Sequence, residues 1–205
     1  MIPDENEDTT DIIGWPTAAQ LSDFYWEDVK NEVPYADGTV IDVKGTDTIG
    51  PLYCEGDLTI QTTKADEGAI LQGTVYVAGD LDFRQTGKRY DIHLNGQTIY
   101  VEGEINIPAG KCHLYGPGCI IAVGDVTFQP NMEGEEFIFV MSVEGTTNFQ
   151  PNGDFTGSIA GNVEVNLQPG CTLTWVSPVP DLNYPGADAS INVISAILTW
   201  EIDTQ

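Results

Sequence analysis

Basic residues are scarce in this sequence. Seven Lys and Arg residues stand against 32 Asp and Glu, and the formal net charge is −25 at pH 7. Recognition of phosphate groups needs clustered Lys and Arg, so this charge excludes a nucleic acid partner and disfavours an anionic membrane surface. Cations, polar glycans and other proteins remain as partners, and a strong net charge also keeps a protein dispersed in solution.

Long apolar runs are missing as well. No segment approaches the ~18 consecutive apolar residues of a transmembrane helix, so we expect no direct membrane contact from this chain. Residues 1–8 are acidic, unlike a signal peptide. An extracellular or cell-surface location therefore implies that a targeting segment has been removed.

Cysteine motifs for metal or redox chemistry are absent. The four cysteines are Cys54, Cys112, Cys119 and Cys171, and none forms a Cys-x-x-Cys pair, which gives no support to a zinc ribbon or a thioredoxin-like site. All four are predicted to point inward from strands, where a free cysteine behaves as a small apolar residue. Two disulfides in three connectivities stay open, and Cys112 and Cys119 flank a predicted turn.

Glycine and proline, by contrast, are abundant, with 22 and 12 residues, which favours strands broken by turns. One helix is predicted over residues 18–32. Thr17 and Gln20 match a capping box, apolar residues then recur at helical spacing, and Pro34 ends the pattern. Such a short helix needs a surface to pack on. We expect it to cover one end of the fold.

From residue 39 to 175 a pattern repeats: alternating apolar residues, a glycine, usually an acid, and alternation again. The glycines mark the predicted structural turns and are Gly56, Gly79, Gly103, Gly124, Gly145 and Gly161. A period near 20 residues without helices matches neither leucine-rich repeats, whose consensus is absent, nor propeller blades. It predicts an all-β fold, a right-handed parallel β-helix (solenoid) of about six coils with an N-terminal capping α-helix.

The alternation assigns the two faces of each strand. The inward set is Leu58, Ile60, Leu81, Phe83, Ile105, Ile107, Val126 and Phe128. Residues 1–14 are predicted to form an acidic flexible tail, and 15–205 one β-helix domain. Within it, 176–205 is a C-terminal strand or cap segment, although Ile191, Ile194 and Ile197 also suit a helical face.

Several outward residues are candidates for a site. Tyr53, Tyr76 and Tyr100 share a register and are predicted to form an exposed ladder that binds a partner. Asp91, His93 and His113 are candidate metal ligands, because two imidazoles and a carboxylate suit zinc or nickel. The acids after the glycines are expected to accept hydrogen bonds from turn amides. Their positions are Asp57, Asp80, Glu104 and Asp125.

The residues also resemble a known family. The helix with Phe24, Tyr25 and Trp26 and the glycine repeats, with segments 116–126, 155–165 and 198–201, are similar to a repeat domain of PilX-like minor components of type IV pilus systems. The resemblance covers residues 15–201 and implies an exported ectodomain that follows an N-terminal membrane helix. The turn at 157–162 also resembles bactofilins, which are cytoskeletal solenoids that polymerise end to end.

These observations predict a non-catalytic extracellular structural or adhesive module without a cofactor and with a protein or glycan partner at the cell surface. The resemblance implies that this module is associated with a pilus. Self-association stays open. Two alternatives are a self-polymerising filament protein and a glycan-active β-helix enzyme. The enzyme would place a carboxylate pair near the basic cluster of Arg84, Lys88 and Arg89. Ser142 lacks a nucleophile elbow and is predicted to be an ordinary strand residue.

Overall fold

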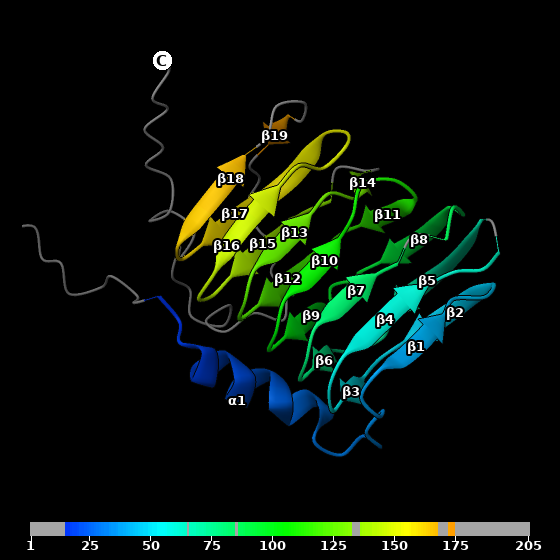
Figure 1. The fold of residues 1–205 in the computed structure, drawn as a ribbon, viewed down its shortest axis with the longest axis horizontal. Coiled ribbons are helices and arrows are strands. Elements are labelled where there is room, and N and C mark those ends of the chain that lie inside the picture. The colour runs from blue at the N-terminus through cyan, green and yellow to red at the C-terminus, as the bar shows by residue number, and fades with distance from the viewer. Residues whose placement is uncertain (1–14, 65, 85, 133–135, 168–171, 175–205) are drawn as a thin grey trace, which may run out of the picture.

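The computed structural model describes residues 15–64, 66–84, 86–132, 136–167 and 172–174. It is a parallel β-solenoid of about six turns with one short helix near the N-terminus, which confirms the predicted fold class (Figure 1). The predicted tail at 1–14, the segment 176–205 and Cys171 lie outside the described residues. No helix in the described ranges has the length and hydropathy to cross a bilayer.

Three parallel sheets form the walls of the solenoid, and each is named here after its first strand. The β1 sheet contains β1 (Thr39–Asp42), β4 (Leu58–Gln61), β7 (Leu81–Phe83), β10 (Ile105–Ile107), β13 (Val126–Phe128), β16 (Thr146–Phe149) and β18 (Glu164–Leu167). The β2 sheet contains β2 (Thr46–Ile49), β5 (Glu67–Leu71), β8 (Tyr90–His93), β11 (Cys112–Tyr115) and β14 (Asn131–Met132). The β3 sheet contains β3 (Leu52–Cys54), β6 (Val75–Val77), β9 (Thr98–Val101), β12 (Gly118–Ala122), β15 (Ile138–Ser142), β17 (Phe155–Gly161) and β19 (Leu173–Thr174).

The chain coils because every strand pairs with its equivalent one turn later. Leu58 lies beside Leu81, Leu81 beside Ile105, and Ile105 beside Val126. All eight residues predicted to point inward are almost fully buried in one continuous core. Burial of each such side chain contributes about 1.5–3 kcal/mol, and this gain offsets the entropy lost when the chain is ordered.

The glycine corners connect the β3 sheet to the β1 sheet. The N–H groups of Gly79, Gly103 and Gly124 each donate to the carbonyl of the preceding corner glycine, at 3.1, 3.0 and 2.9 Å. Gly145 lies beside Gly124 at the same corner but donates its N–H to Ser142 Oγ, and Gly161 lies outside the column. Gly161 pairs with Ser142 inside the β3 sheet, and Val163 lies at the corner level because the last turn is shorter.

The prediction that the acids accept hydrogen bonds from turn amides is confirmed for Asp57, Asp80 and Asp125, but not for Glu104. The Asp57 carboxylate accepts the Asp80 N–H at 2.9 Å, and the Asp80 carboxylate accepts the Glu104 N–H at 2.8 Å. Asp125 accepts the Thr146 N–H at 2.7 Å in the same way. Each of these three aspartates therefore connects its own turn to the next one.

Helix α1 (Ala18–Val29) begins with the predicted capping box of Thr17 and Gln20. It ends three residues before the predicted boundary, and Val33 beyond it is 85% exposed. The prediction that the helix covers an end of the solenoid is wrong. It lies along the outer face of the β3 sheet and crosses the strands (Figure 1). Its apolar side packs there on outward apolar side chains of the sheet, including Tyr76, Tyr100 and Ile121.

Polar contacts fix the position of α1 along the stack. Before the helix, Trp15 Nε1 donates to the Val143 carbonyl at 2.8 Å. Near the C-terminal end of the helix, Thr74 Oγ1 donates to Asp28 at 2.6 Å. Between them Leu21, Tyr25 and Val29 are fully buried against the sheet. Residues 15–29 thus cross the wall from Val143, just after β15, to Thr74, just before β6. Trp26 also contacts Tyr53 of β3, with ring centroids 4.9 Å apart.

Three cysteines lie in the described ranges, and all are buried free thiols. Cys54 and Cys112 belong to the solenoid core, as predicted. Cys119 does not: it points outward and packs under α1, while Ile120 occupies the inward position. Burial raises the pKa of Cys112 and of Cys119 to about 12, so both stay protonated at neutral pH.

Candidate functional site

The tyrosine ladder is not an exposed binding face. Tyr53, Tyr76 and Tyr100 do lie in one register and point outward from the β3 sheet, as the alternation predicted. However, α1 covers them: Tyr100 is fully buried, Tyr76 is 3% exposed and Tyr53 is half-buried. Tyr25 stacks on Tyr100 with ring centroids 5.1 Å apart. The predicted exposure failed because the helix packs on this ladder.

The buried tyrosine hydroxyls hold the helix in place. Tyr76 Oη and Ser22 Oγ lie 2.7 Å apart, and both groups donate to the Glu102 carboxylate. Tyr100 Oη donates to the Ala18 carbonyl at 3.3 Å. Burial, followed by the Glu102 hydrogen bond, raises the pKa of Tyr76, and burial raises that of Tyr100. These tyrosines have a structural role.

The outer face of the β2 sheet carries a different set of side chains. One column runs Thr46, Gly68, Asp91, His113 and Asn131, and the column beside it runs Thr48, Ile70, His93 and Tyr115. Both histidines are outward, as predicted, and both are partly exposed. Hydroxyl, carboxylate, imidazole, phenol and amide groups therefore lie side by side on one rigid wall.

A shallow hollow of about 300 Å³ opens on this face. It lies over Gly68, which has no side chain, and is lined by residues of β2, β5 and β8 and of the turns before them. The lining residues are Gly45, Thr46, Asp66, Glu67, Gly68, Ala69, Ile70, Asp91 and His93. Three carboxylates, one hydroxyl and one imidazole thus line a shallow concave surface.

Side chains next to the hollow are held in place by their neighbours. Arg89 Nε is 3.1 Å from Asp91 Oδ1, and Arg89 Nη2 donates to the Tyr115 hydroxyl at 3.2 Å. His93 stacks on Tyr115 with ring centroids 4.3 Å apart and planes at 13°. These contacts restrict Asp91 and His93 to defined rotamers, which lowers the entropy lost when a ligand binds.

The predicted metal site is not formed. His113 is level with Asp91 on the adjacent strand, but His93 is level with Tyr115, two residues further along. The two histidines therefore do not stack one above the other. Within the described ranges no three His, Cys, Asp or Glu side chains converge as a metal site would require.

The basic cluster is divided between two sheets. Arg84 follows β7 on the β1 sheet, with Nε 3.8 Å from Asp82 Oδ2, whereas Arg89 precedes β8 on the β2 sheet. Ser142 is buried in β15, where its hydroxyl donates to the Gly124 carbonyl at 2.7 Å and accepts the Gly145 N–H at 3.0 Å. Ser142 is thus an ordinary strand residue, as predicted.

Sequence reasoning missed Gly68 and Tyr115. The signal for Gly68 was present, because a glycine inside the strand Glu67–Leu71 indicates a bulge or open space on the face it leaves empty. Tyr115 became relevant only through the register that places it beside His93.

Comparisons of the chain with family models, curated proteins and solved structures found no match.

Proposed function

We propose that this protein is a non-catalytic structural or adhesive module of the cell surface that binds a glycan through the outer face of the β2 sheet. The observation that carries the proposal is the hollow over Gly68, with its rigid polar lining. Carboxylates accept hydrogen bonds from sugar hydroxyls, and a hydroxyl such as that of Thr46 can both donate and accept. Concave sites with a small number of fixed polar groups are typical of ligand binding.

A scaffold role is supported by the regular stack. Its interior is filled by one continuous apolar core, and each wall is hydrogen-bonded from turn to turn. Such a solenoid presents side chains at fixed spacings along an extended surface. The strong negative charge favours neutral or amino sugars over acidic ones, because an acidic polysaccharide would be repelled. The resemblance to pilus repeat domains supports a surface location.

Binding to an array of neutral, amino and acidic polysaccharides tests the proposal. We expect the chain to be retained on neutral or amino sugars. In Thr46→Trp the indole fills the hollow, and we expect the affinity to fall at least about tenfold, which corresponds to about 1.4 kcal/mol. Thr59→Trp is the matched control, because Thr59 is an outward residue on β4 of the β1 sheet. It should bind as the unmodified chain does.

Two results would contradict the proposal. If neither tryptophan variant alters retention on any polysaccharide that the chain binds, the hollow is not the binding site. If the chain releases new reducing ends from a polysaccharide, the protein is an enzyme.

A further inference from the structure

Among the described residues, the strands of the first turn each have one unpaired edge. This turn consists of Tyr35, which bridges to Cys54, followed by β1 and β2. Within the described ranges, β1 pairs only with β4 and β2 only with β5. The helix lies on the flank of the β3 sheet and leaves this end uncovered (Figure 1). Unpaired strand edges of this kind are templates for pairing with another chain.

A charged residue occupies the inner layer at this end. Asp47 of β2 is aligned with Ala69, which is followed in the same column by Ile92 and Leu114. Those three side chains are fully buried in the core. Asp47 therefore lies on the inward parity of its strand at the terminal layer, where it is partly exposed.

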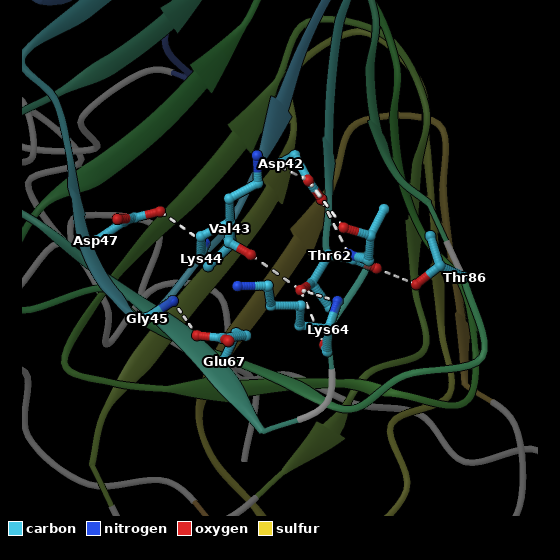
Figure 2. A network of polar contacts seen from close by, with 10 residues as sticks. Asp42, Val43, Lys44, Gly45, Asp47, Thr62, Lys64, Glu67 and Thr86 are labelled. Carbon is cyan, nitrogen blue, oxygen red and sulfur yellow. Dashed lines mark hydrogen bonds and ion pairs between the residues drawn. The ribbon is translucent and has the colours of Figure 1, made fainter.

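Side-chain carboxylates also accept hydrogen bonds from backbone N–H groups at the corner between β1 and β2 (Figure 2). The Asp47 carboxylate accepts the Lys44 N–H at 2.7 Å, and Glu67 accepts the Gly45 N–H. The Asp42 carboxylate accepts both the N–H and the hydroxyl of Thr63, each at 2.9 Å. Glu67 and Thr63 belong to the next turn of the stack, so their bonds join the first turn to the second, whereas the bond between Asp47 and the Lys44 N–H lies within the first turn itself.

We infer that Asp47 prevents this end of the solenoid from pairing with a second copy of the chain. Stacking of another molecule on the first turn would bury the Asp47 carboxylate. Its hydrogen bond from the Lys44 N–H does not neutralise it, and burial of a charge without a compensating opposite charge is costly. Inward-pointing charges on edge strands are a known protection against edge-to-edge association. Ile41, which is also on the inward parity of the first turn, is partly exposed, whereas Val43 and Ile49 are already buried in the core.

The test is the molar mass of the full chain in solution, measured by light scattering after size exclusion. In Asp47→Val the inner layer becomes continuous with Ala69, and we expect about a doubling of mass or more relative to the unmodified chain. Asp47→Asn keeps an acceptor for the Lys44 N–H and removes only the charge. It should associate less than Asp47→Val, and it covers the case in which the valine variant does not fold.

Thr48→Val is the matched control, because Thr48 is the next residue of β2 but faces outward beside Ile70. This variant introduces the same valine side chain without changing the inner layer, and its molar mass in solution should equal that of the unmodified chain. Circular dichroism and thermal unfolding confirm that each variant is folded. Hydrogen exchange should show new protection in β1 and β2 of the associated species. The inference is overturned if folded Asp47 variants keep the mass of the unmodified chain, or if Thr48→Val associates equally.

Discussion

Gly79 illustrates why a corner of the solenoid requires a residue without a side chain. A Cβ atom built on Gly79 would lie 2.4 Å from Asp57 Oδ1 and 2.6 Å from the carbonyl carbon of Gly56. The backbone atom cannot move without disturbing the stacked corner, and the carboxylate is bonded to the Asp80 N–H. The requirement comes from the close approach of successive turns.

We therefore expect Gly79→Ala to lower the free energy of unfolding by about 1–3 kcal/mol, as overpacking does, measured by urea denaturation. Gly68→Ala is the control, because the new Cβ atom would have more room. It would lie 3.2 Å from the Asp91 carbonyl oxygen and 3.7 Å from the Asp91 Cβ atom. Its cost should be clearly smaller. Equal losses in the two variants would contradict the steric explanation for the corner.

At the scale of the element, α1 depends on tertiary packing. Twelve residues are marginal as an isolated helix, even with a capping box. Its stability comes from the layer in which Leu21, Tyr25 and Val29 meet the tyrosines of β6 and β9. The helix in turn shields an outward apolar column that includes Ile121 and Met141. Helix and column stabilise each other.

Tyr25→Ala removes the ring that stacks on Tyr100, and we expect a loss of about 3 kcal/mol or more in the free energy of unfolding. Phe24→Ala changes the adjacent aromatic residue, whose side chain is 39% exposed, and should cost much less. Urea denaturation measures both variants. Binding of a hydrophobic dye should rise only in Tyr25→Ala, because the covered column becomes accessible. A similar cost for Phe24→Ala would argue that the buried stack does not anchor the helix.

At the scale of the whole molecule, burial couples stability to alkaline pH. The pKa values of Tyr76 and Tyr100 are raised in the folded chain, first by burial and then by hydrogen bonding or charge from Glu102. Unfolded tyrosine ionises near pH 10, as do model peptides. Since ionisation is easier in the unfolded chain, the stability is fully present below about pH 10 and is lost as pH rises above it.

We thus expect the free energy of unfolding to fall steeply above about pH 10, with phenolate absorbance of these tyrosines appearing only as the chain unfolds. The buried thiols of Cys112 and Cys119, with pKa raised to about 12, act in the same direction. A Tyr76→Phe, Tyr100→Phe double variant should show a shallower decline. An unchanged slope in that variant would mean that other groups determine the alkaline limit.

Much of the architecture could be predicted because period and alternation are local properties. The corner glycines, the inward residues such as Leu81 and Phe83, and the capping box at Thr17 all follow from sequence spacing. The candidate site was harder to predict. Asp91 and His93 were singled out, but Gly68 and Tyr115 join them only through strand register, and His113 is displaced from His93 by two residues.

The repeating sequence pattern was enough to predict a coiled stack of parallel strands. Each repeat has a glycine flanked by alternating apolar residues, and it can bury its inward side chains only against the neighbouring repeats. The tertiary structure alone decided which outward surface stays exposed. Alternation assigned Tyr76 and Tyr100 correctly to the outside of the wall, yet α1 covers them and leaves the β2 sheet open. The sequence of an amphipathic helix shows that the helix must pack on an apolar surface. Which surface it packs on depends on contacts between residues more than 50 positions apart, such as Ser22 with Tyr76.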